Sequence, residues 1–242
     1  MVSIDPALRE DLVAANHILA HEGVVDGFGH VSARVGPGHF ILARSMAPLL
    51  VSSADILTFD LASTECGGDT RTLYLERFIH SEIYRARSDV HAIVHSHSPA
   101  TIPFGAVKGV TLQPIYHMSA FLGQGTPVFE IRNVGGYSTD MLIRNRQLGE
   151  ALAQDLSGSA VVLMRGHGVT VVGTSLRQAV FRAVYTELNA RVQMLAMGIG
   201  EVEYLNREEA DAATLANDSQ IARAWELWRL RAESYRTHSL EF

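Results

Sequence analysis

Apolar residues recur with helical spacing in some segments of the chain and form short unbroken runs in others. Helical spacing predicts helices over residues 6–22, 76–87, 139–154 and 175–197, and helical structure over much of residues 207–236. Asp5 and Pro6 support the first of these, because Asp commonly caps a helix and Pro fits its first turn. In the last, Trp225 and Trp228 are spaced to share one face.

Short runs rich in β-branched residues and bounded by Gly, Pro or Ser predict strands. Three such runs, HVSARV, HFIL and ILTF, lie between His30 and Phe59. Another covers residues 90–96, and a pair at residues 160–164 and 169–172 brackets the sequence Arg165-Gly-His-Gly. Alternation of helices with strands favours an α/β layered fold. We expect a single domain over residues 1–242, with a C-terminal helical segment from about residue 206 to 236.

The composition limits the classes of partner. The 242 residues are 47% hydrophobic and 19% charged, with a net charge of −6, which is not the basic surface that nucleic-acid binding requires. The chain shows neither a signal-like N-terminus nor an apolar run of about 20 residues, the length of a membrane span. We therefore expect a cytoplasmic protein that binds neither nucleic acid nor membrane. The only cysteine, Cys66, rules out an intrachain disulfide.

Three histidines indicate a metal site. His95 and His97 are two residues apart at a predicted strand end, so their side chains point to the same face. His167 lies between Gly166 and Gly168, whose lack of a side chain lets the backbone turn tightly and leaves the ring accessible. Three imidazoles with an open position are typical of a catalytic metal ion. The plainer interpretation, polar residues at a strand end and in a turn, remains open at this point.

Together with these histidines, other motifs resemble the class II aldolase/adducin family over about residues 8–200. They are Glu76 four residues before His80, the run R-x-D-V-x-A-I-V-H-x-H at residues 87–97, Tyr116 before a glycine-rich segment, and Gly-His-Gly at residues 166–168. The resemblance implies a three-layer α/β/α domain with a central mixed, mainly antiparallel sheet, assembled as a homotetramer. It also implies that His95, His97 and His167 bind one divalent ion and that Glu76 is the acid/base carboxylate.

The sequence departs from the sugar-phosphate aldolases of that family where they have phosphate-binding turns. Phe28-Gly29-His30, Arg44-Ser45-Met46-Ala47-Pro48 and Tyr74-Leu75 occupy the matching places. Such turns bind anions through hydroxyls and backbone N–H groups, and bulky apolar residues remove much of that donor set. A phosphorylated sugar is therefore disfavoured. The patterns G-F-G-H-V-S-x-R and A-R-S-x-A-P instead resemble the decarboxylase branch of the family.

That branch implies a metal-dependent decarboxylase, active in aromatic catabolism, for an ortho-hydroxylated aromatic or pyridine dicarboxylate such as 3,4-dihydroxyphthalate. The ion would be Mn or Zn, with Co or Fe as alternatives, and Glu76 would supply the proton. Other candidates are His30 and Tyr116 as catalytic residues, Arg44, Ser45 and His117 as substrate-binding residues, and His80 as a support for Glu76. Arg44 as a surface arginine and Tyr116 as a half-buried strand residue are the simpler interpretations.

Three other functions stay open from the sequence. The same ligands would serve a class II aldolase that cleaves a non-phosphorylated hydroxy-keto acid. They would also serve a non-haem iron enzyme that uses O2. The third is a non-catalytic module like the adducin head, which the retention of His95, His97 and His167 disfavours.

Overall fold

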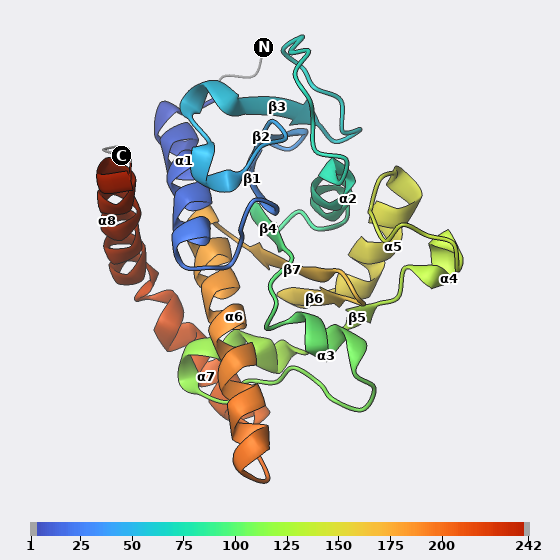
Figure 1. Ribbon diagram of the computed structural model, residues 1–242, viewed down its shortest axis with the longest axis vertical. Helices are drawn as coiled ribbons and strands as arrows, with labels where there is room; N and C mark the ends of the chain where they lie inside the picture. The colour runs from blue at the N-terminus through green and yellow to red at the C-terminus, as the bar shows by residue number, and fades with distance from the viewer. Residues whose placement is uncertain (1–3, 240–242) are drawn as a thin grey trace.

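A seven-stranded sheet runs through the centre of the molecule, as the computed structural model of residues 4–239 shows (Figure 1). The strand order is β3-β2-β1-β4-β7-β6-β5. The strands are β1 (His30–Val35), β2 (His39–Ala43), β3 (Ile56–Asp60), β4 (Ala92–Ser96), β5 (Val128–Phe129), β6 (Val161–Met164) and β7 (Gly168–Gly173). Every neighbouring pair is antiparallel except β5 and β6, which are parallel. The expected mixed, mainly antiparallel sheet is confirmed.

Helices cover both faces of the sheet and complete the expected α/β/α layers (Figure 1). One face is covered by α1 (Pro6–His21) and α6 (Leu176–Ile199), and α8 (Ile221–Ser239) packs on these two helices. The other carries α2 (Arg77–Ala86) and α5 (Arg146–Leu156). Strand β4 shows how one strand serves two cores. Its Val94 belongs to the core under α1 and α6, while Ile93 belongs to the core under α2 and α5, as the period of two requires.

Short elements make up most of the connections. They are the 3₁₀ turns η1 (Pro48–Leu50), η2 (Ser53–Asp55) and η3 (His117–Gln124), and the helices α3 (Ile102–Ala106), α4 (Arg132–Gly135) and α7 (Arg207–Asp218). The sequence did not predict η3, α4 or the two-residue strand β5. Each is too short for a periodic apolar pattern to develop.

Two predicted helices differ in extent from the structure. The helix expected over residues 139–154 begins only at Arg146, because Asn145 is extended and its side chain caps the backbone N–H of Leu148. The helical structure expected over much of residues 207–236 consists of two helices, α7 and α8, separated at Ser219–Gln220. The shortening of α5 matters for the site, because residues 139–145 are left free to contact it.

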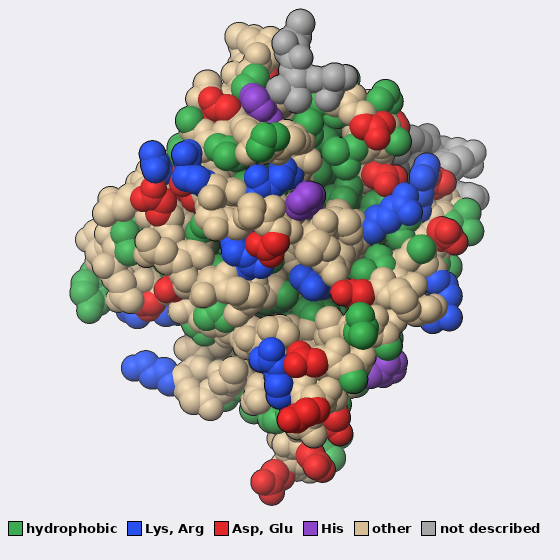
Figure 2. Space-filling view, turned by 180° about the vertical axis from the view of Figure 1, so that it is seen from behind, with side chains coloured by type: hydrophobic (Ala, Val, Ile, Leu, Met, Phe, Trp, Pro, Cys, Tyr) green, Lys and Arg blue, Asp and Glu red, His purple; other side chains and the backbone are tan. Residues whose placement is uncertain are grey.

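On the face seen in Figure 2, acidic and basic side chains are interspersed. Among the described residues, none of the helices combines the length and the apolar character needed to cross a bilayer.

Candidate active site

The three predicted metal-binding histidines meet at one end of the central strands. His95 is in β4, His97 is the first residue after the end of β4, and His167 lies in the turn between β6 and β7. The Nε2 atom of His97 is 3.2 Å from that of His95 and 3.0 Å from that of His167. Because β4 pairs with β7, side chains 70 residues apart in the sequence become neighbours.

Two glycines allow this approach. Gly166 has a φ of +63°, in the left-handed region that favours glycine. At Gly168, an added Cβ would lie 2.1 Å from the carbonyl oxygen of Ser96, a distance that no side chain can tolerate. The glycines on either side of His167 thus shape the turn and let β7 pack closely against the end of β4.

In two of these rings the hydrogen bond made by Nδ1 determines whether Nε2 carries a hydrogen or a lone pair. Nδ1 of His167 is 2.8 Å from the carbonyl oxygen of Met141, so this nitrogen must donate its hydrogen and Nε2 keeps its lone pair. Nδ1 of His95 is 3.3 Å from the hydroxyl of Thr170, which itself donates to the sulfur of Met164. His95 therefore also donates through Nδ1 and presents an Nε2 lone pair.

Glu76 completes the cluster. It is the N-cap residue of α2 and is buried, and its Oε2 atom lies 3.5 Å from His95 Nε2 and 3.4 Å from His167 Nε2. Its Oε1 atom accepts a hydrogen bond from the backbone N–H of Ile143. Burial opposes ionisation of this carboxyl, but positive charge at the positions of His167 and His95 outweighs burial and holds its pKa well below the usual range.

These groups fit a divalent cation. One ligand atom from each of Glu76, His95, His97 and His167 lies within 4.8 Å of the other three. Imidazole lone pairs and a carboxylate crowded this closely repel one another unless a positive charge lies between them. The donor hydrogen bonds on the far side of His95 and His167 are those by which proteins orient metal-binding imidazoles. The structure thus brings together the four residues that the sequence assigned to the ion and the acid/base.

His30 is adjacent to this cluster, and His80 has a different partner from the one expected. In the register of β1 and β4, His30 lies directly opposite His95, and the two ring centroids are 5.1 Å apart. His80 was expected to support Glu76. Instead its Nε2 atom is 2.6 Å from Nδ1 of His30, because the ring turns toward β1 rather than along α2. Within the described residues, Glu76 receives its support from Ile143, His95 and His167.

A cavity of about 390 Å³ opens beside the cluster. Its lining includes Phe28, His30, Ser45, Met46, Tyr74, Leu75, Glu76, His97 and Leu142. Apart from Leu142, the apolar and aromatic side chains come from the three segments that replace the phosphate-binding turns. The ring of Tyr74 packs at a tilt against that of His30, with 4.6 Å between centroids, and its hydroxyl donates to the carbonyl oxygen of Met46, which fixes one wall.

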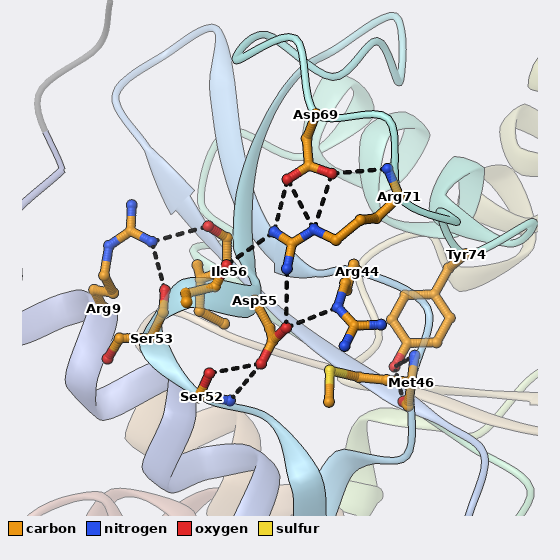
Figure 3. A network of polar contacts seen from close by, with 11 residues as sticks. Arg9, Arg44, Met46, Ser52, Ser53, Asp55, Ile56, Asp69, Arg71 and Tyr74 are labelled. Carbon is orange, nitrogen blue, oxygen red and sulfur yellow. Dashed lines mark hydrogen bonds and ion pairs between the residues drawn. The ribbon is translucent and has the colours of Figure 1, made fainter.

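Ser45 and Arg44, both predicted to bind substrate, have different positions. Ser45 lines the cavity. Arg44 does not, because its Nε atom donates to Asp55 at 2.7 Å, which turns its guanidinium toward Asp55, beside Tyr74 and Met46 (Figure 3). Asp55 also accepts from Ser52 and Arg71, so Arg44 belongs to a polar network that ties neighbouring loops together.

Tyr116 and His117 are not brought to the cluster within one chain. Tyr116 precedes η3 and contacts Tyr185 of α6, with ring centroids 6.4 Å apart. His117 is exposed, and its carbonyl oxygen accepts from Asn217 of α7. No contact in the part of the chain that the structure describes joins either side chain to Glu76 or the three histidines.

Sequence reasoning missed the residues that hold the ligands. Met141 and Ile143 act through their backbone, which accepts from His167 and donates to Glu76. Met141 has a φ of +73°, a conformation that is strained for a side-chain-bearing residue and is typical of functional sites. Thr170, which pairs with His95 across the sheet, could have been suspected as a polar residue in an apolar strand.

Comparison with known proteins identifies the class to which this fold and site belong. The Class II Aldolase and Adducin N-terminal domain matches residues 10–194, and the chain belongs to that family. It is 34% identical to Decarboxylase tropJ of Talaromyces stipitatus over 248 residues, which cover 92% of each chain. It is 31% identical to 3,4-dihydroxyphthalate decarboxylase of Arthrobacter keyseri over 238 residues, 93% of this chain and 94% of the relative.

A solved structure supports the fold. The L-fuculose 1-phosphate aldolase from Glaciozyma antarctica superposes with a TM-score of 0.77 over 96% of this chain and 90% of that one, at 24% identity. Family membership and the decarboxylase relatives make the chain a carbon–carbon lyase, on the carboxy-lyase side of the family.

Proposed function

We propose that the chain is a metal-dependent decarboxylase that removes CO2 from an ortho-hydroxylated aromatic or pyridine dicarboxylate, such as 3,4-dihydroxyphthalate, in aromatic catabolism. The observation that carries the proposal is the cluster of His95, His97, His167 and Glu76 beside a cavity lined with aromatic and apolar side chains. The name of the relative from Arthrobacter keyseri, 3,4-dihydroxyphthalate decarboxylase, supports the substrate class.

The shape of the cavity favours a planar ring. Tyr74 is held by Met46 and its ring packs at a tilt against that of His30, so the wall facing the cluster is aromatic and fixed in orientation. Aromatic faces bind other rings in offset or edge-to-face arrangements. Polar contacts would come from Ser45 and His30 at the cavity lining.

Decarboxylation needs an electron sink and a proton. A divalent ion, Mn or Zn in our proposal, would polarise the substrate's hydroxyl-derived oxygen and stabilise the charge released as the C–C bond breaks. When CO2 leaves, the electron pair of the broken bond stays on the ring, and the vacated carbon must gain a proton. Glu76 is our candidate for that transfer, because Ile143 fixes one of its oxygens and leaves the other facing the cluster.

The low pKa of Glu76 determines the order of proton movements. Glu76 is ionised in the resting site, so it must take up a proton before it can deliver one. The hydroxyl group of a bound ortho-hydroxy acid is a suitable source. The proton then moves from the hydroxyl oxygen to Glu76 and from Glu76 to the ring carbon, and the carboxylate is restored.

We also propose that the chain forms a homotetramer. Tyr116 and His117 lie away from their own chain's cluster, so a role for them in catalysis requires that they reach the site of a neighbouring subunit. Arg44 would contribute indirectly, by holding the loop that carries Ser45 and Met46.

A panel of ortho-hydroxy aromatic and pyridine acids, assayed for CO2 release, tests the main proposal. The protein is stripped with chelator and reloaded with Mn, Zn, Co or Fe in turn, under air and under nitrogen. We expect CO2 release that depends on the added metal and is unchanged without oxygen. Release of pyruvate or an aldehyde would instead identify an aldolase, and strict dependence on Fe(II) and O2 would identify an oxygen-dependent enzyme.

A further inference from the structure

A buried chain of hydrogen bonds leads away from His30 into the core between β1 and α2. Nδ1 of His30 is 2.6 Å from Nε2 of His80, Nδ1 of His80 is 2.6 Å from the hydroxyl of Ser32, and that hydroxyl is 2.8 Å from the hydroxyl of Tyr84. At most 4% of the surface of any of these four residues is exposed.

Strand β1 and helix α2 each contribute two residues to this chain of hydrogen bonds, at the spacing that puts side chains on one face of the element. His30 and Ser32 are two apart on β1 and share one face of the sheet. His80 and Tyr84 are four apart on α2 and share one face of the helix. Packing α2 on β1 therefore interleaves the four side chains. The function proposed above uses only the first of them.

The hydrogens that these groups carry determine in which direction they donate along this chain of hydrogen bonds. Tyr84 can donate to Ser32, Ser32 to His80, and Nε2–H of His80 to Nδ1 of His30. In the opposite direction Ser32 would donate to Tyr84, and the tyrosine's own hydrogen would have no acceptor among the described residues, at a site only 1% exposed. A buried hydroxyl without an acceptor is costly, so the first direction is favoured.

Neutral rings are consistent with this direction. Burial, together with the neighbouring His95, lowers the pKa of His80 to about 3. A ring whose Nδ1 atom accepts a hydrogen bond carries no hydrogen there, so each of the two rings has a single N–H. In the favoured direction Nδ1 of His30 accepts, so its one hydrogen is on Nε2.

We propose that Tyr84, Ser32 and His80 are positioning residues that fix His30 as the Nε2–H tautomer, so that His30 donates a hydrogen bond to the carboxylate that stays on the substrate. The substrate part rests on the proposed function. Nε2 of His30 makes no hydrogen bond within the described residues, and the ring lines the cavity. A fixed donor there favours a dicarboxylate over a monocarboxylate, because only the former has a second anionic acceptor.

Nuclear magnetic resonance of the zinc-loaded protein labelled with ¹⁵N-histidine tests the tautomer without any assay of activity. Two-bond ¹H–¹⁵N correlations distinguish the two tautomers, and the signals are assigned from variants that lack His30 or His80. We expect Nε2–H on both rings. Nδ1–H on both would mean that the chain runs the other way, and would overturn the proposal.

Binding of phthalate and benzoate to the same zinc-loaded protein tests the consequence. In His80→Gln the side-chain amide can still accept from Ser32 and donate to His30, whereas His80→Leu can do neither. We expect His80→Leu to weaken phthalate binding about tenfold, the effect of one lost hydrogen bond to a charged group, with His80→Gln close to wild type and benzoate unaffected.

The outcomes separate the two proposals. If His80→Leu leaves phthalate affinity unchanged while the wild type releases CO2, the role of His30 is wrong and the decarboxylase stands. If no acid of the panel is decarboxylated, the proposed function fails, and the tautomer is still decided by the spectra. Loss of kcat in His80→Gln equal to that in His80→Leu would indicate proton transfer along the chain and would overturn a purely positioning role.

Discussion

At the scale of single residues, the two proposed roles in the cluster can be separated by mutation. His167→Ala removes an Nε2 lone pair that faces the other ligands, so we expect metal content and CO2 release to fall together. Glu76→Gln preserves the shape of the side chain and removes its capacity to carry a proton. We expect it to retain metal and to lose activity by at least about a hundredfold, the usual contribution of an acid or base. Metal analysis and CO2 release measured on the same samples check both.

The burial of His80 gives a second prediction at this scale, on stability against pH. Its pKa is about 3 in the folded protein, well below the ordinary 6.5, mainly because burial disfavours the charged form. A lowered folded pKa gives stability that is fully present above pH 6.5 and is lost as the pH falls toward 3. His80→Gln does not titrate. Between pH 6.5 and 5 its free energy of unfolding should therefore fall by about 2 kcal/mol less than that of the wild type.

Urea unfolding of wild type and His80→Gln at both pH values, in metal-free buffer, measures this difference. Histidines that do not contact His80 are common to both proteins, so their titration cancels. The pKa of His30 is lowered partly by His80, so its change in His80→Gln acts in the same direction as the loss of His80 itself. Equal losses of stability in the two proteins would show that His80 is accessible to protons in the folded state.

The side chains that meet in the proposed metal site were predictable from the sequence, whereas their supports were not. Strand periodicity and the flanking glycines made His95, His97 and His167 candidates, and the family resemblance grouped them with Glu76. The hydrogen bonds of Met141 and Ile143 use backbone atoms, which have the same chemistry in every residue and leave no signature in sequence. His80 was assigned to Glu76 from helical spacing alone, which cannot show that β1 presents His30 and Ser32 to the same ring.

At the scale of elements, the close packing of β7 on β4 determines where His167 lies. Gly168→Ala would put a methyl group 2.1 Å from the carbonyl oxygen of Ser96, so the strands must separate. Overpacking of this kind costs about 1–3 kcal/mol. We expect that loss of stability, measured by urea unfolding, together with weaker metal retention.

Gly158→Ala is the matched control, because a Cβ at Gly158 meets nothing within 4 Å. It should leave both stability and metal content near wild type. Full metal retention in a destabilised Gly168→Ala would show that the position of His167 does not depend on this contact.

Helices and strands were predictable where the pattern of apolar residues continued for several turns. The predicted boundary of a helix was wrong where the preceding residues contact the site. The apolar residues of segment 139–145 suggested an early start for α5. In the structure Ile143 is buried by the same turn that points its N–H at Glu76. An apolar residue in a turn and one in a helix look alike in sequence when both face the core.

At the scale of the whole molecule, the far end of α6 bears on the proposed tetramer. This end extends beyond the sheet (Figure 1). Its exposed apolar side chains include Leu188, Val192, Leu195 and Ile199, the last two 69% and 89% exposed. Spacings of four, three and four residues put them on one stripe of the helix. Exposed apolar surface of this kind typically marks a contact with another chain.

We therefore expect Leu195→Glu combined with Ile199→Glu to dissociate the oligomer, because two carboxylates would have to be buried in the contact. Leu215→Glu on α7 is the control, since Leu215 is 77% exposed but lies off this stripe. Light scattering on size-exclusion chromatography measures the mass. A wild-type monomer at micromolar concentration would refute the tetramer.

Metal content and activity of the dissociated variant connect the assembly to the site. Glu76 and the three histidines come from one chain, so the dissociated variant should bind metal as wild type does. If Tyr116 acts in a neighbour's cavity, CO2 release by the dissociated variant should nevertheless fall. Tyr116→Phe should then lower CO2 release when made in the wild type and cause no further loss when made in the dissociated variant. A fully active monomer would confine catalysis to the residues around Glu76 and assign Tyr116 to packing against Tyr185.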